Sequence, residues 1–259
     1  MKLLKGKKGL VMGIANERSI AWGIAKEAYN HGAELCLTYQ NEVFQDRISK
    51  LGKTIDCEHI LECDVENITN IENLFQTLKT RWHKIDFIIH ALAFSDKNEL
   101  KGNFYDTSKS NFRKTLLIST FSFTEITREA QDLMSTDGGS ILTLTYIGGN
   151  RTAPNYNIMG VAKSALEASV RYLSVDLGKK NIRVNSLSSG PMRTLAGSAI
   201  TGARHIYRHS ERNSPIERNP SLQEVSKSAI YLISDLSSGV TGENHFVDGG
   251  YNITAIPKE

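Results

Sequence analysis

Short, mostly apolar runs alternate with longer segments of helical period along the whole chain. Several of these runs contain almost no polar residue, which is typical of central strands in a sheet covered on both faces. The predicted strands are Lys8–Met12, Glu34–Thr38, His59–Cys63, Asp86–His90, Ser140–Thr145, Ile182–Leu187 and Asn244–Val247.

Helices are predicted between the strands. Ile20–Asn30 follows Ser19, a residue type that favours helix N-caps, and precedes Gly32, which favours helix ends. Two longer helices are expected over Ser108–Met134 and Asn155–Leu177. An apolar stripe at helical spacing predicts one more helix, through Ile71, Leu74, Phe75 and Leu78.

Repeated strand–helix units with right-handed crossovers predict an α/β fold. We expect a Rossmann-type doubly wound parallel sheet of about seven strands with helices on both faces. No linker, repeat or shift in composition divides residues 1–259. We therefore expect one domain for dinucleotide binding and catalysis.

Composition and charge exclude several classes of protein. Hydrophobic residues make up 40% and charged residues 23% of the 259 residues, which is ordinary for a folded domain and excludes a disordered tail. The net charge is only +3, and the basic clusters at residues 5–8 and 204–209 are too short for a nucleic-acid interface. We expect no nucleic-acid partner.

The three cysteines, Cys36, Cys57 and Cys63, fit neither a disulfide framework nor a zinc site, so we expect reduced thiols and no bound metal. The first residues lack the apolar core of a signal peptide. The longest apolar run, near residues 87–94, is interrupted by His90 and is too short to span a membrane. These features predict a soluble, cytoplasmic protein without a membrane span.

The loop after the first strand is a candidate phosphate-binding loop. It joins strand to helix, so its backbone N–H groups and the positive helix end can meet a pyrophosphate. Gly13 permits a tight turn, Ala15 leaves room for close approach, and the Ser19 hydroxyl, next to Ile20, can donate to phosphate. The alternative is an ordinary turn glycine and a simple helix cap, since the loop does not match G-x-G-x-x-G.

The ends of the next strands are candidates for the rest of a dinucleotide. Gln40 stands where an acidic residue usually binds the adenosine ribose, and no arginine beside it would pair with a 2′-phosphate, which favours NADH over NADPH. Asp64 and Val65 are candidates for the adenine, although Asp64 could equally cap the next helix. Ala91 and Leu92, after the fourth strand, leave space for the cofactor or are simply packed.

Tyr156 and Lys163 are predicted on one helix, where a spacing of seven residues is just under two turns. Both side chains would then face one cleft, which Tyr146 also reaches from the end of the fifth strand. A phenol paired with an ammonium suits the stabilisation of an oxyanion. The alternative is an amphipathic helix with a half-buried tyrosine and a lysine that extends to solvent.

Nearly the whole chain resembles the short-chain dehydrogenase/reductase superfamily, and within it the divergent branch of NADH-dependent enoyl-acyl-carrier-protein reductases. The resemblance rests on the segments 13–21, 64–65, 154–160 with Lys163, 183–185, 190–194 and 247–250, together with Tyr146. Ordinary members carry Tyr-x3-Lys, but Met159 occupies that tyrosine position here. Tyr105 and Lys109 form a Tyr-x3-Lys in the wrong place, which we interpret as a coincidental surface pair.

The resemblance implies reduction of the trans-2 double bond of enoyl-acyl-carrier-protein thioesters with NADH in bacterial fatty-acid elongation. Tyr156 would bind the thioester oxygen, Lys163 would hold the nicotinamide ribose and supply charge, and Tyr146 would shape the cleft. Met192 and Thr194 would bind the nicotinamide amide. The acyl chain would contact Ala93, Phe94, Tyr146, Tyr156, Met159, Ala196 and Ile200.

Residues 195–210 are expected to form a mobile lid over the substrate, or else a loose surface helix. Acyl-carrier protein is acidic, and Arg193, Arg204 and Arg208 near the lid would attract it. The resemblance also implies a homotetramer. Two other functions stay open: a carbonyl reductase acting on 3-oxoacyl or other ketones, and a nucleotide-binding protein without catalysis.

Overall fold

Seven parallel strands form one sheet in the residues that the computed structural model describes, which are 2–134, 137–198 and 200–256. Their order across the sheet is β3-β2-β1-β4-β5-β6-β7, which confirms the predicted doubly wound arrangement. The strands are β1 Lys8–Met12, β2 Glu34–Tyr39, β3 His59–Glu62, β4 Phe87–His90, β5 Gly139–Thr145, β6 Ile182–Ser189 and β7 Asn244–Val247.

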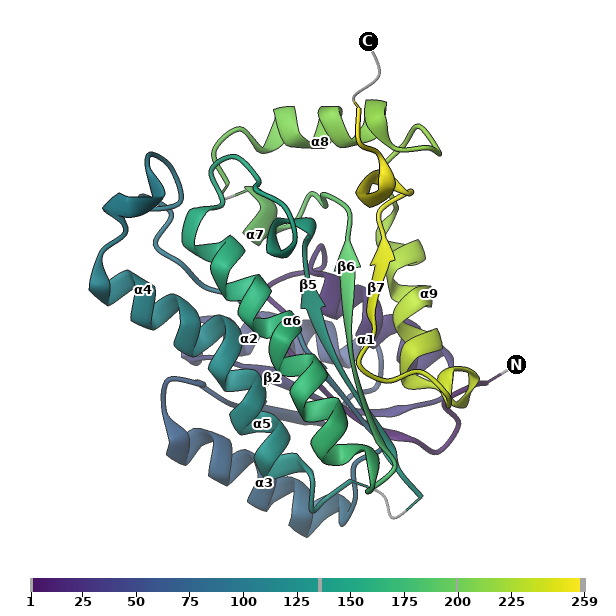
Figure 1. Cartoon of the computed structure of the whole chain (residues 1–259). Helices are drawn as coiled ribbons and strands as arrows, with labels where there is room; N and C mark the ends of the chain where they lie inside the picture. Colours follow the sequence, from purple (N-terminus) through teal and green to yellow (C-terminus); the bar gives the residue numbers. More distant parts are fainter. Residues whose placement is uncertain (1, 135–136, 199, 257–259) are drawn as a thin grey trace.

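Helices cover both faces of this sheet (Figure 1). One face carries α3, α5 and α6, and the other carries α1, α2 and α9. The helices are α1 Ile20–Asn30, α2 Glu42–Lys53, α3 Ile68–Trp82, α4 Lys109–Leu116, α5 Ser122–Ala130, α6 Asn157–Gly178, α7 Leu195–Ser198, α8 Ala203–Asn213 and α9 Leu222–Ile233. None of the helices described is both long and apolar enough to cross a membrane.

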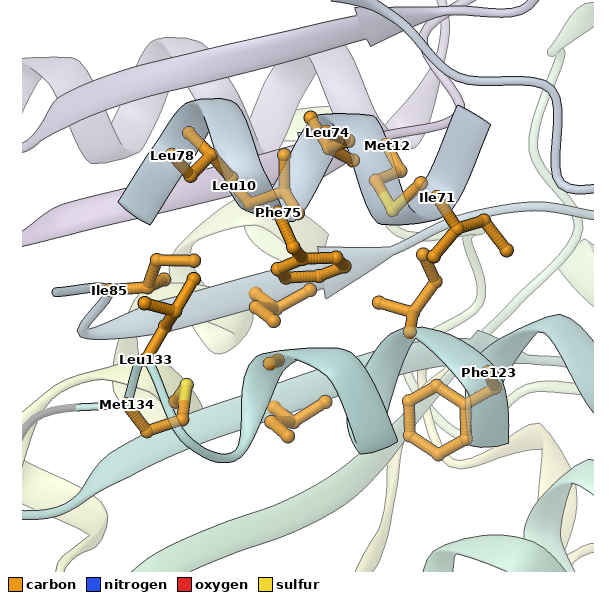
Figure 2. Close-up of a cluster of buried hydrophobic side chains, with 14 of the residues drawn as sticks. Leu10, Met12, Ile71, Leu74, Phe75, Leu78, Ile85, Phe123, Leu133 and Met134 are labelled. Atoms are coloured by element: carbon orange, nitrogen blue, oxygen red, sulfur yellow. The ribbon is translucent and has the colours of Figure 1, made fainter. Parts of the chain in front are cut away.

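Two apolar cores separate the sheet from its helices because successive strand residues point to opposite faces. In β1, Leu10 and Met12 pack against the α3 and α5 side, whereas Val11 packs on the α1 and α9 side. Figure 2 shows Phe75 of α3 and Phe123 of α5 within the core on the α3 and α5 side of the sheet. Each such buried side chain contributes about 1.5–3 kcal/mol to folding.

The helix expected over Ser108–Met134 is interrupted. A wider π-helical turn over Leu117–Phe121 separates α4 from α5, and α5 ends at Ala130. The hydroxyls of this turn bond to neighbouring segments, because Thr120 Oγ1 donates to Ala162 O at 2.8 Å and Ser119 Oγ donates to Phe94 O at 3.1 Å. The turn therefore joins these helices to α6 and to the chain after β4, contacts that helical periodicity does not reveal.

Strand order reverses between β1 and β4, and the site lies at the carboxyl ends of the central strands. The register aligns Met12 of β1 with His90 of β4, and His90 with Thr143 of β5. The next residues of these three strands, Gly13, Ala91 and Leu144, therefore lie next to one another. A crevice at such a reversal is the usual ligand-binding position in open α/β sheets.

Candidate active site

The turn after β1 lies directly against the end of β4. Gly13 has φ +93°, and a Cβ built on it would lie 2.2 Å from Ala91 O. Any side chain at residue 13 would therefore be strained by its backbone and would collide with the adjacent main chain. The close approach of the two main chains explains the glycine at this position.

Ser19 is at the N-cap position of α1, but its side chain does not cap the helix. Ser19 Oγ instead accepts hydrogen bonds from Ala15 N at 3.0 Å and Asn16 N at 3.1 Å. The simple-cap interpretation of Ser19 is therefore wrong, because the hydroxyl shapes the loop. The first turn of α1, which begins with Ile20, contains no acidic residue. This positive helix end fits a phosphate group.

The adenosine side of the crevice follows β2 and β3. Gln40 is exposed directly after β2, and Val65 is buried after β3. Asp64 Oδ1 accepts from Glu66 N at 3.1 Å, while Asn67 caps α3. The alternative role of Asp64 as the helix cap is therefore wrong.

An arginine that sequence reasoning missed reaches the phosphate loop from α2. Arg47 Nη1 donates to Ala15 O at 3.1 Å. This contact could not be predicted from the sequence, because Arg47 lies 32 residues after Ala15 and only the packing of α2 against β2 and β3 brings the two residues together.

The two predicted tyrosines contact each other. The rings of Tyr146 and Tyr156 meet edge to face with centroids 5.2 Å apart. Tyr156 is 8% exposed and Tyr146 is partly buried. Burial raises the pKa of Tyr146 to about 12 and raises the pKa of Tyr156 further above its ordinary value. Both phenols therefore keep their protons at neutral pH and can donate hydrogen bonds.

Tyr156 does not lie on the helix with Lys163, as the spacing argument assumed. It is the N-cap of α6, which begins at Asn157. Asn155 has a positive φ of 57°, so the right-handed helix cannot begin at this residue and include Tyr156 as a helical position. The expected helix start at Asn155 is therefore wrong by two residues, although Tyr156 and Lys163 are both buried at this end of the sheet.

Lys163 is buried in α6 with its amine directed at the end of β5. Its Nζ donates to Leu144 O at 2.8 Å, and the residue is 5% exposed. Burial lowers the pKa of Lys163 to about 8, although Glu167 partly opposes this effect. At pH 7 the amine is therefore mostly protonated, and one of its hydrogens is committed to the main chain of β5.

His90, at the end of β4, is a buried group that the sequence did not single out for chemistry. Its Nδ1 lies 3.1 Å from Thr143 Oγ1, and its Nε2 lies 2.9 Å from Ser122 Oγ. Burial and the nearby Lys163 lower its pKa to about 3, so the ring is neutral. Two hydroxyls thus satisfy an uncharged imidazole that joins β4 to β5 and α5.

The chain after β6 contains further predicted site residues, and one of them reaches the two tyrosines. Met192 is partly buried against the α1 and α9 core, and Thr194 Oγ1 accepts from Gly197 N at 3.0 Å. Ile200 packs against the cluster that contains both tyrosines, whereas Ala196 is exposed. Residue 199, which falls in the expected lid, lies outside the described residues.

The remaining predicted substrate residues lie in the chain after β4 or close to it, namely Ala93, Phe94 and Met159. The predicted cofactor contact Leu92 lies in the same segment. Met159 is buried, and Ser119 Oγ lies 3.8 Å from its sulfur. Leu92 packs on the α3 and α5 core, Ala93 is exposed, and Phe94 is 43% exposed with Lys114 Nζ 5.1 Å above its ring.

The other tyrosine–lysine pair is on the surface. Tyr105 lies in a short 3-10 turn with 82% of its surface exposed, and Lys109 begins α4 and is also exposed. The interpretation of these two residues as a surface pair is confirmed.

Comparison with known proteins agrees with this arrangement. Residues 13–252 match the family described as enoyl-(acyl carrier protein) reductase. The enoyl-[acyl-carrier-protein] reductase [NADH] 2 of Rhizobium meliloti is 54% identical over 98% of this chain and 95% of that protein. The corresponding FabI of Rickettsia bellii is 52% identical over 99% of this chain and 97% of its own length.

Solved structures of reductases with this description are also similar to the chain. FabI from Candidatus Liberibacter asiaticus superposes with a TM-score of 0.96 and 52% identity, covering 99% of each chain. The reductase of Anaplasma phagocytophilum, solved in complex with NAD, gives a TM-score of 0.96 and 49% identity over 99% of this chain and 98% of that one. The sequence match and the superposition over nearly the whole chain show that it belongs to the enoyl-(acyl carrier protein) reductase family of short-chain dehydrogenase/reductases.

Proposed function

We propose that this protein is an NADH-dependent enoyl-[acyl-carrier-protein] reductase of bacterial fatty-acid synthesis. It reduces the trans-2 double bond of enoyl thioesters carried by acyl-carrier protein. One observation carries the proposal. Protonated Tyr156 and cationic Lys163 are both buried at the carboxyl ends of the strands, and Lys163 bonds to Leu144 beside the point where Gly13 approaches Ala91.

The residues of the crevice fit NADH, which supplies a hydride when bound. Gly13, Ala15, Ser19 and Ile20 would hold its pyrophosphate, because Gly13 has no side chain and the helix end is positive. The other contacts with NADH are assigned by position. Gln40 would bind the adenosine ribose, and Asp64 and Val65 would bind the adenine. Ala91 and Leu92 would lie along the cofactor, Lys163 would bind the nicotinamide ribose, and Met192 and Thr194 would bind the carboxamide.

Tyr156 serves the chemistry as a hydrogen-bond donor. When hydride adds to the β-carbon, the electron pair of the double bond moves toward the thioester and charge develops on its carbonyl oxygen. A phenol whose pKa is raised by burial remains protonated and donates to that oxygen. A proton from solvent then adds to the α-carbon, which completes the saturated thioester. Tyr146 holds the Tyr156 ring by an edge contact.

Lys163 supplies positive charge to the same cleft, and this makes the reaction dependent on pH. The amine is charged below its pKa of about 8 and loses its proton above it. We therefore expect kcat/KM to be level near pH 7 and to fall about tenfold per pH unit above pH 8. Initial rates with crotonyl thioester across this range measure the effect. A level profile up to about pH 10 would show that Lys163 charge is not required.

The acyl chain would lie between the end of β4 and the segment after β6. Ala93, Phe94, Met159, Ala196 and Ile200 are the proposed contacts, together with both tyrosines. Ile200 supports this placement because it packs directly on the tyrosine cluster. Residues 195–210 would act as the lid within the single catalytic domain formed by residues 1–259.

Acyl-carrier protein would approach α8 and the chain before it. Arg193, Arg204 and Arg208 are exposed there, and Arg193 lies 4.6 Å from the centroid of the Tyr207 ring. An acidic carrier is attracted by these cations, and salt screens the attraction. We expect the rate with carrier-bound substrate to fall as salt is added, while the rate with crotonyl-CoA changes less. Equal salt dependence would remove this role.

We further propose that the protein forms a homotetramer and is located in the cytoplasm. Apolar side chains stand exposed on α4, α6 and the turn before α5, namely Phe112, Phe121, Val161, Tyr172 and Val175. Light scattering should then give about four times the chain mass of 28.8 kDa. The three cysteines are free thiols, which suits a reducing compartment, and cell fractionation tests the location.

The direct test of the function follows NADH absorbance with two substrates. Crotonyl thioester should be reduced and acetoacetyl thioester should not. Consumption of NADH only with the ketone would establish a carbonyl reductase instead. Binding of NADH without consumption of either substrate would leave a nucleotide-binding protein.

A further inference from the structure

Glu167 is a buried carboxyl group that the reduction described above does not use. It lies one helical turn after Lys163 in α6 and is 4% exposed. We propose that Glu167 is a positioning residue of the active site, which holds the end of β5 before Tyr146 and keeps Lys163 positively charged. This inference rests on the proposed function, because it assigns Glu167 a part in the same reaction.

Two neighbouring side chains of α6 hold two consecutive residues of β5. Lys163 Nζ donates to Leu144 O at 2.8 Å, and Thr145 Oγ1 donates to a Glu167 carboxylate oxygen at 2.6 Å. Residues four apart share one face of a helix, so both bonds act on the same short piece of strand. Tyr146 directly follows Thr145, so its position against Tyr156 depends on the positions of Leu144 and Thr145.

The same carboxylate supports the turn that follows Tyr146. A Cβ built on Gly149 would lie 2.6 Å from Glu167 Oε1, which shows how closely the turn approaches the carboxylate. The Asn150 side chain hydrogen-bonds to Glu167, and Ser164 Oγ donates to Gly149 O. Glu167 is thus in contact with both ends of the segment that carries Tyr146.

Glu167 is an acidic group close enough to favour the charged form of Lys163. Its own pKa is raised above the ordinary value, chiefly by burial, whereas the bonds from Thr145 and Asn150 and the nearby cations act in the opposite direction and favour the carboxylate. Glu167 in turn raises the pKa of Lys163 against the effect of burial. Of the other titratable groups near the pair, His90 interacts with Lys163 and Tyr156 with Glu167, and both are neutral at pH 7. Arg171 lowers the pKa of Glu167.

Glu167→Gln tests the inference, because the amide keeps the size and one hydrogen-bond acceptor but removes the charge. We expect the pKa of Lys163 to fall by roughly one unit, since an opposite charge typically shifts a pKa by ~1–3 units. The alkaline limb of kcat/KM should move to lower pH by the same amount. In cofactor-free protein with ¹⁵N-labelled lysine, NMR titration of the Lys163 amine, assigned with Lys163→Met, should show the same shift.

Two further variants separate charge from packing. Ser164→Ala removes the bond to Gly149 on the same helix but leaves both charges, so the titration of Lys163 should stay unchanged. Thr145→Val removes one bond that favours the carboxylate, so a smaller shift in the same direction is expected. Thermal unfolding of each variant shows whether it is folded. If Glu167→Gln does not fold, the titration of Thr145→Val decides.

The inference is overturned if Lys163 titrates unchanged in folded Glu167→Gln, or in Thr145→Val when that variant decides. An equal shift in Ser164→Ala also overturns it, because loop packing alone would then explain the result. Failure of the proposed function is a different outcome. The parent would then consume no NADH with crotonyl thioester at any pH, while the NMR titration would still report on Glu167 and Lys163.

Discussion

Replacing Lys163 with methionine is expected to lower kcat/KM for crotonyl thioester by about 10³-fold. In the proposed mechanism the ammonium supplies positive charge to the cleft where the oxyanion develops and binds the nicotinamide ribose, so its loss removes both interactions. Methionine preserves much of the length and apolar packing of the buried side chain. The rate of NADH oxidation is measured at saturating and at limiting NADH, and the affinity for NADH is measured by fluorescence titration.

The chain provides a matched control for this variant. Lys109 belongs to the exposed Tyr-x3-Lys of residues 105–109, so Lys109→Met removes a lysine that lies on the surface. Its activity should equal that of the parent. A Lys163→Met protein that is folded and reduces the thioester at the parental rate would contradict the role of Lys163.

Replacing Tyr156 with phenylalanine is expected to lower kcat by about 10²-fold, with little change in the affinity for NADH. The substitution removes one hydrogen-bond donor but keeps the ring that packs against Tyr146. A donor that acts on the developing oxyanion affects the chemical step more than ground-state binding. Steady-state kinetics and NADH titration of the same preparation separate these two effects.

Tyr105→Phe is the control for Tyr156→Phe, because it makes the same chemical change on a residue that is 82% exposed. It should leave kcat unchanged. If Tyr156→Phe raised KM and left kcat at the parental value, the phenol would contribute to binding and not to stabilisation of the oxyanion.

Most of the fold could be predicted because its information is local. Each strand is a short apolar run, and the alternation of Leu10, Val11 and Met12 between the two cores follows from strand geometry. The α3 stripe is likewise a consequence of helical period. The π-helical turn over 117–121 was missed because its cause is the contact of Thr120 and Ser119 with distant segments.

The candidate site could be predicted in residue type more than in geometry. Tyr156 and Lys163 were predicted on one face of one helix, but the left-handed backbone of Asn155 places the tyrosine before the helix, which begins at Asn157. Glu167 was missed altogether. Its spacing of four from Lys163 was visible, but its burial depends on the turn at Gly149, which packs against it only in the folded chain.

The placement of Tyr156 before the first helical turn links the proposed hydrogen-bond donor to the proposed lid over the substrate. Asn155 Nδ2 donates to Thr201 O at 2.8 Å, so the residue next to the phenol is bonded to the segment between α7 and α8. Displacement of that segment must carry Asn155 along or break this bond, at a net cost of about 1 kcal/mol. Entry of a long acyl chain beneath the lid would therefore affect the position of the group that donates a hydrogen bond to the thioester oxygen, whereas Lys163, within its helix, would keep its position.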